Sequence, residues 1–214
     1  MTRPTQPEVS AAVAATAMFV EVLVVGIGSL AALAVFFVSL AGVNNASRLA
    51  PLAESTVIAG LSLAFAYALG ILVDRGADSI LASKRRQFRA RYFASSATYA
   101  EAKKAISSNP DLMARADYAR SRMRICRGWV FNSLLLFIAI DFAIMRFPLE
   151  GRILMISATT VIGFLLVLGF YVAWRNITLT SYRKLALQAR SIVPHLFPQQ
   201  VTTFTRGDSE GSAL

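Results

Sequence analysis

The sequence predicts an all-α membrane protein: a four-transmembrane-helix bundle with a basic cytoplasmic helical hairpin between helices 2 and 3. Hydrophobic residues make up 56% of the 214 residues, and charged residues make up only 16%. A soluble domain carries about 25% charged residues. The charges are also unevenly placed, because four long blocks almost lack them and the segments between the blocks hold them. Long apolar blocks separated by charged segments are typical of membrane-spanning helices.

The four apolar blocks are each long enough to cross a bilayer. They cover residues 18–43, 52–73, 128–147 and 153–174. At about 1.5 Å per residue, roughly 20 helical residues cross a hydrocarbon core of about 30 Å. The first block is too long for the apolar core of a secretory signal, so we expect it to remain in the protein as the first span.

The Lys and Arg residues between the blocks predict the orientation of the spans. Thirteen of them lie from Arg75 to Arg127 and five lie from Arg175 onward, whereas the two short loops at the other side hold three. Because Lys and Arg accumulate on the cytoplasmic side, we expect the long segment and both termini in the cytoplasm of a bacterial cell, with the spans in the inner membrane. Trp129 and Trp174 then lie at the inner boundary, where aromatic side chains gather.

This topology divides the chain into six segments. The spans form two transmembrane hairpins, and a basic amphipathic helix follows the last span. The tail after that helix is rich in polar residues and proline, and we expect it to be disordered. In chain order, the segments are a cytoplasmic N-terminal segment at 1–17, transmembrane hairpin 1 at 18–74, the basic cytoplasmic helical hairpin at 75–127, transmembrane hairpin 2 at 128–176, the amphipathic helix at 177–193 and the tail at 194–214.

The cytoplasmic hairpin is predicted from its helix-forming residues and from one signal for a new helix. An Asn-Pro-Asp run at 109–111 combines a favoured N-cap, a favoured first helical residue and an acid at the positive end of the helix dipole. The helix before this run would be nearly twice as long as the arm after it. We therefore expect the first arm to bend, at Gly76 or at the Ser pair 95–96. Asp74 and Asp78, at the start of this arm, are expected to pair with Arg75 or with the arginines of residues 122–127.

Three polar residues within the spans are candidates for a pore or an ion path: Glu21, Asn132 and Asp141. Ionisable groups inside a bilayer are costly and are functional candidates for that reason. Glu21 has the alternative of lying at the inner interface. Asp141 has two alternatives, an ion pair with Arg146 or Arg152 and a partner on another helix, because a spacing of five is poor for a pair within one helix.

The two arms of the cytoplasmic hairpin carry the predicted basic surface. Three interpretations remain open for it: binding of anionic lipid headgroups, binding of an acidic protein or nucleic acid, and retention of cations that only set the topology. The residues of this surface are Lys84, Arg85, Arg86, Arg89, Arg91, Arg120, Arg122 and Arg124.

Small residues at a spacing of four in the second span, Ser62, Ala66 and Gly70, predict a helix-packing face. Small side chains let two helices approach closely in a membrane. Such faces serve contacts within one chain or between chains, and we expect the protein to be a homo-oligomer.

The sequence contains no motif of a known enzyme class. It has no phosphate-binding loop of the Walker type, no HExxH and no CxxC, and its only histidine, His195, lies in the tail. We therefore expect no enzymatic activity, no cofactor and no metal site. The favoured function is an oligomeric channel or pore-like component. The alternative is a membrane anchor or scaffold whose basic arms bind a protein partner, anionic lipid or nucleic acid. Membrane lipid and a cytoplasmic protein are the expected partners, and nucleic acid is the least favoured.

Overall fold

The structure is a computed structural model that describes residues 6–42, 45, 47–48, 51 and 54–194, with the side chains of 6–14 left aside. Five long helices make up the described chain: α1 (Gln6–Ala41), α3 (Thr56–Ala90), α4 (Ser96–Ser107), α5 (Pro110–Arg146) and α6 (Arg152–Ile192). No strand occurs among these described residues. Four of the helices, α1, α3, α5 and α6, are long and apolar enough to span a membrane. The all-helical class and the four candidate spans are therefore confirmed.

The helices continue across several of the predicted segment boundaries. Helix α1 begins at Gln6, well before the predicted first span. Helix α5 runs without a break through Gly128, and α6 joins the predicted span 153–174 and the predicted amphipathic helix 177–193 in one helix. The predicted disordered tail, apart from its first residue, lies outside the described residues.

The predicted bend of the first arm occurs at one of its two expected places. Helix α3 continues through Gly76 and ends at Ala90, so the helix does not break at Gly76. A single glycine weakens a helix by only about 1 kcal/mol, and Asp74 and Asp78 on either side of Gly76 are held by ion pairs. The chain turns instead before Ser95, whose side chain caps α4 by accepting a hydrogen bond from the Thr98 backbone.

The predicted start of the second arm is confirmed. The Asn109 side chain accepts hydrogen bonds from the backbone N–H groups of Asp111 and Leu112, at 3.0 and 3.2 Å. Pro110 occupies the first helical position, where its missing N–H group costs nothing. The cap therefore fixes where α4 ends and α5 begins.

Helices α1 and α5 pack side by side and run in the same direction. Asn132 of α5 donates a hydrogen bond to the Val25 carbonyl oxygen at 2.6 Å and accepts one from the Ser29 hydroxyl at 2.7 Å. Gly128 lies one turn earlier on α5, where a Cβ atom would come within 2.7 Å of the Val25 side chain. Contacting residues on the two helices therefore rise in residue number in the same direction, as expected for parallel helices. The small residue Gly128 lets the two backbones approach.

Helices α5 and α6 form an antiparallel pair. The rings of Trp129 and Phe170 stack with their centroids 5.8 Å apart. Two turns further along α5, the Phe137 side chain fills the space at Gly163. The short turn between the helices ends at Gly151, whose backbone has a φ of 68° that favours glycine.

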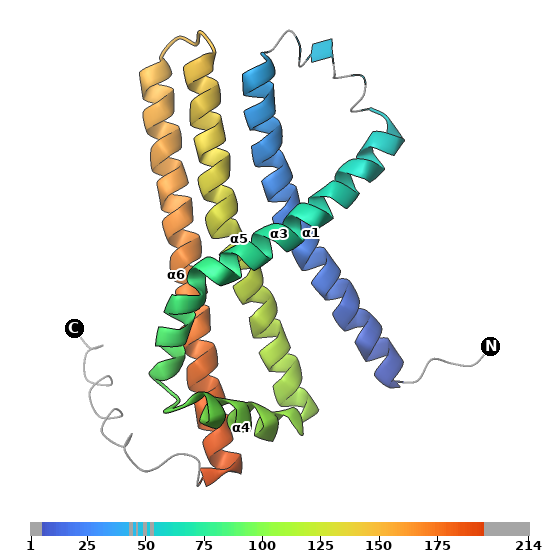
Figure 1. The fold of residues 1–214 in the computed structure, drawn as a ribbon, viewed down its shortest axis with the longest axis vertical. Coiled ribbons are helices and arrows are strands. Elements are labelled where there is room, and N and C mark those ends of the chain that lie inside the picture. Colours follow the sequence, from blue (N-terminus) through green and yellow to red (C-terminus); the bar gives the residue numbers. More distant parts are fainter. Residues whose placement is uncertain (1–5, 43–44, 46, 49–50, 52–53, 195–214) are drawn as a thin grey trace, which may run out of the picture.

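Helix α3 crosses α1 obliquely instead of standing beside it along its length (Figure 1). At the crossing, a Cβ atom on Gly26 would overlap the carbonyl oxygen of Ala66, and one on Gly70 would overlap that of Val22. Ala66 and Gly70 are buried there, whereas Ser62 is only half-buried. The packing face therefore contacts α1 through its last two members, and the first half of α3 diverges from the bundle.

Helix α4 packs on the last turns of α6. A small apolar cluster joins the two helices and the turn that follows α3. Its members are Phe93, Ala102, Ala186 and Ala189, with Tyr92, Tyr99, Tyr182 and Leu185 packed against them. The apolar face of the predicted amphipathic helix is therefore used within the chain.

Candidate functional site

A cavity of about 1320 Å³ lies between α3, α4, α5 and α6. Residues of all four helices line it. In Figure 1, α3 passes across α5 and α6, and α4 lies near the lower ends of these two helices. Along α6 its lining extends from Trp174 to Gln188. We call this space the basic cavity because of the charges described below.

Two sets of contacts hold α3 against α5 and α6. The Phe88 ring packs on Trp174 of α6, with centroids 5.8 Å apart. Arg127 of α5 pairs with Asp74 and Asp78 of α3. The local signals at Ser95 and Asn109 then turn the chain so that α4 leads from α3 back to α5. The cavity therefore follows from one oblique helix and two capped turns.

The lining of the cavity is strongly cationic. It contains ten Lys or Arg residues and only two acids, Asp74 and Asp78. Helix α3 contributes Arg75, Arg85 and Arg89, α4 contributes Lys103, α6 contributes Lys184, and α5 contributes all five arginines from Arg115 to Arg127.

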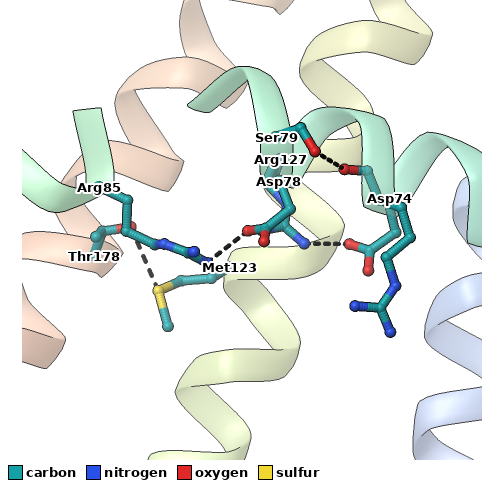
Figure 2. Close-up of polar contacts among 8 residues, drawn as sticks. Asp74, Asp78, Ser79, Arg85, Met123, Arg127 and Thr178 are labelled. Carbon is teal, nitrogen blue, oxygen red and sulfur yellow. Dashed lines mark hydrogen bonds and ion pairs between the residues drawn. The ribbon is translucent and has the colours of Figure 1, made fainter. Parts of the chain in front are cut away.

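The two acids are used in a network of ion pairs between α3 and α5, which Figure 2 shows. Arg127 is 11% exposed and contacts both Asp74 and Asp78. Asp78 also accepts a hydrogen bond from Arg85 at 2.6 Å. The predicted pairing of these acids with the arginines of residues 122–127 is confirmed, and the pairing with Arg75 is not found among the described residues.

Six of the ten lining cations form no ion pair with any residue that the structure describes: Arg75, Arg89, Lys103, Arg115, Arg122 and Lys184. Two of these six lie over aromatic rings, Arg89 over Tyr99 at 5.2 Å and Arg122 over Tyr118 at 4.9 Å. The cavity wall therefore keeps a large uncompensated positive charge.

The structure divides the predicted basic surface into two groups. Arg85, Arg89, Arg120, Arg122 and Arg124 line the cavity. The other three, Lys84, Arg86 and Arg91, are exposed and are not part of its lining.

Four residues of the cavity lining were not predicted as site residues from the sequence: Lys103, Lys184, Tyr99 and Tyr182. They lie on α4 and α6, which belong to two different predicted segments, the cytoplasmic hairpin and the amphipathic helix. No local pattern shows that these segments meet.

Comparisons with protein-family models, curated proteins and solved structures found no match for this chain. A function can therefore be argued only from the residues of the site and their geometry, because folds host many functions.

The three candidates for an ion path lie at contacts between helices. Asn132 is fully buried between α1 and α5. Glu21 is 12% exposed, and one of its carboxylate oxygens lies 3.9 Å from Arg124 of α5. That oxygen is buried and has no hydrogen-bond partner among the described residues. Within one chain, Asn132 therefore holds two helices together, and Glu21 faces a cation.

Asp141 is bound by hydroxyl groups of α6. Its carboxylate accepts hydrogen bonds from Thr159 and, at 2.8 Å, from Thr160. Among the described residues it forms no ion pair, so the alternative of a pair with Arg146 or Arg152 is not found. Its partners do lie on another helix, but they are hydroxyl groups and not cations. The antiparallel register of α5 and α6 places the threonines opposite Asp141 and places Arg152 two turns away.

Metal ligands are not grouped in the part of the chain that the structure describes. No set of three or more His, Cys, Asp or Glu residues there could hold a metal ion. The chemical property that stands out in the described lining of the cavity is its positive charge.

Proposed function

We propose that this chain is a non-enzymatic membrane protein that anchors an anionic partner at its basic cavity. The observation that supports the proposal is the lining of that cavity, with ten Lys or Arg residues against two Asp. In this proposal the cavity end of the bundle faces the cytoplasm, because Lys and Arg accumulate on that side of a membrane. The expected cell is bacterial, and the expected location is the inner membrane.

The arrangement of the charges favours binding over a purely topological role. A concave site lined by one sign of charge concentrates the electrostatic field and raises the local concentration of the opposite charge. The four cations that do form ion pairs include Arg127, which attaches α3 to α5, and Arg85, which pairs with Asp78 within α3. The six unpaired cations are then held around one space, where a partner with several negative charges can contact more than one of them.

Charge reversal inside the cavity is expected to weaken the binding of an acidic polymer. We choose Lys103→Glu with Lys184→Glu, because both side chains are exposed and form no ion pair among the described residues. The probe is poly-L-glutamate, and it is added to the detergent-purified full chain. At low salt the double variant should bind this probe about tenfold more weakly, which corresponds to a loss of about 1.4 kcal/mol. Binding by the unaltered chain should fall steeply as salt is added.

The matched control reverses the neighbouring cations, Lys104→Glu with Arg183→Glu. These residues lie on the same two helices and change the net charge equally, but they do not line the cavity. Their variant should bind almost as well as the unaltered chain. Equal losses in the two variants would show that only the total charge matters, and absence of binding by the unaltered chain would overturn the proposal.

The oligomeric channel predicted from the sequence stays a prediction. It requires several chains around a path, because Asn132 is closed within one bundle and Asp141 is bound by α6. The channel therefore predicts an assembly of four or more chains in detergent. Light scattering with the detergent mass subtracted tests this, and the mass of a single 23.2 kDa chain would argue against the channel.

A further inference from the structure

We infer that the basic cavity contains a binding subsite for a phosphate group, formed by Arg85 and Arg89 of α3 together with Tyr99 of α4 and Tyr182 of α6. All four residues line the cavity. The inference rests on the proposed function and deepens it, because it names the chemical class of the anion.

The four side chains converge although they come from three helices. The Arg89 guanidinium lies 5.2 Å from the centre of the Tyr99 ring. The Tyr99 and Tyr182 rings are 5.9 Å apart in an edge-to-face arrangement. Arg89 also donates a hydrogen bond to the Ser96 hydroxyl at 3.2 Å, which ties the end of α3 to the start of α4. Arg89, Tyr99 and Tyr182 are therefore held in place before any ligand arrives, and Arg85 is the fourth member of the group.

Tyr182 remains a neutral hydrogen-bond donor in this setting. It lies eight residues beyond Trp174, outside the predicted span 153–174. Burial raises the pKa of its phenol, Tyr99 adds to the rise, and the charges of Arg85 and Arg89 oppose it. At neutral pH the phenol thus keeps its proton, and two guanidinium groups act on the same place.

Arginine suits a phosphate group because its planar fork can donate two parallel hydrogen bonds to two oxygens. Arg89 forms no ion pair among the described residues. Arg85 is paired with Asp78, but Asp78 also contacts Arg127. Arg85 can therefore turn toward a ligand while Asp78 keeps a cation, so the change leaves no buried acid without a partner.

A phosphate group can come from two sources at this position. One is the headgroup of an anionic lipid, because the cavity lining reaches Trp174 at the predicted membrane boundary. The other is a soluble phosphate compound, because the same lining extends to Lys103 and Gln188. The shared chemistry is the phosphate group, and the experiment has one arm for each source.

The first arm measures the binding of inorganic pyrophosphate to the detergent-purified full chain by titration calorimetry. The second arm counts phosphatidylglycerol molecules that stay bound to the chain from mixed vesicles in native mass spectrometry. In whichever arm shows binding, Arg85→Gln with Arg89→Gln should weaken it at least tenfold, because two charged hydrogen-bond donors are lost. Tyr182→Phe should weaken it about threefold to tenfold, because a single hydroxyl donor is lost.

Two substitutions serve as controls. Arg86→Gln removes a cation of the same helix that does not line the cavity, and Tyr92→Phe removes a hydroxyl from a tyrosine packed on the same apolar cluster. Both should bind phosphate as the unaltered chain does. Tyr182→Phe keeps the ring that packs on Tyr99, so it keeps the inference testable even if the double arginine variant does not fold.

The inference is overturned if neither source of phosphate binds, or if the cavity variants and the controls lose binding equally. It is also overturned if Tyr182→Phe and the arginine variant both bind as the unaltered chain does. Binding of poly-L-glutamate through Lys103 and Lys184 without phosphate binding would leave the anchor proposal standing and remove this subsite. Phosphate binding without poly-L-glutamate binding would remove the anchor proposal and leave this subsite standing.

Discussion

Replacing Gly26 with alanine is expected to separate α1 from α3 and to lower the free energy of unfolding by about 2–3 kcal/mol, the upper part of the range of about 1–3 kcal/mol for overpacked contacts. The added Cβ atom would overlap the backbone carbonyl oxygen of Ala66, which cannot move without the whole helix. Gly70→Ala should act similarly from the other side, because its Cβ atom would overlap the Val22 carbonyl oxygen. Thermal unfolding of the purified protein in one detergent measures both effects.

Gly169→Ala is the matched control for this prediction. Gly169 is also a glycine within a spanning helix, but nothing lies within 4 Å of the place its Cβ atom would take. Alanine favours a helix by up to about 1 kcal/mol over glycine, so this variant should be as stable as the unaltered chain or slightly more stable. If Gly26→Ala and Gly169→Ala behaved alike, the close crossing of α1 and α3 would not exist.

Arg127→Leu is expected to lower the free energy of unfolding by about 3–5 kcal/mol, which is the usual cost of removing one partner of a buried ion pair. Arg127 contacts Asp74 and Asp78, and its removal leaves Asp74 without a cation among the described residues. Helix α3 would also lose its polar attachment to α5. We therefore expect weaker binding of poly-L-glutamate in addition to the lower stability.

An exposed ion pair of the same helix provides the comparison. Arg120 pairs with Asp117 at 2.7 Å, and both side chains are exposed. Arg120→Leu should change the free energy of unfolding by no more than about 0.5–1 kcal/mol, because surface pairs contribute little. Adding Asp74→Asn to Arg127→Leu should restore part of the stability. No recovery in that double variant would mean that Arg127 acts through packing alone.

The membrane class and the helix starts could be predicted because they depend on local properties. The transfer of an apolar block into a bilayer is favourable whatever its neighbours are, so the four spans follow from composition. The cap at Asn109 is equally local, since its hydrogen-bond donors lie two and three residues along the chain. The pairing of Asp74 and Asp78 with the run 122–127 was predictable because opposite charges lie at the ends of adjacent spans.

The cavity could not be predicted, because it depends on the path of α3 in space. The crossing is fixed by contacts of Gly26 with Ala66 and of Val22 with Gly70, and several other small pairs in the sequence have the same spacing. The partners of Asp141 were missed for a similar reason. Thr159 and Thr160 are visible as hydroxyls within an apolar span, but only the register of α5 against α6 shows that they lie opposite the carboxylate.

Helices α5 and α6 pass from the apolar region to the cavity without interruption, over 37 and 41 residues. At about 1.5 Å per residue they are stiff rods of roughly 55 and 60 Å. A rod of this kind carries a tilt imposed at one end to its other end. An occupant of the cavity near Lys184 would therefore contact the same two rods that form two of the candidate spans.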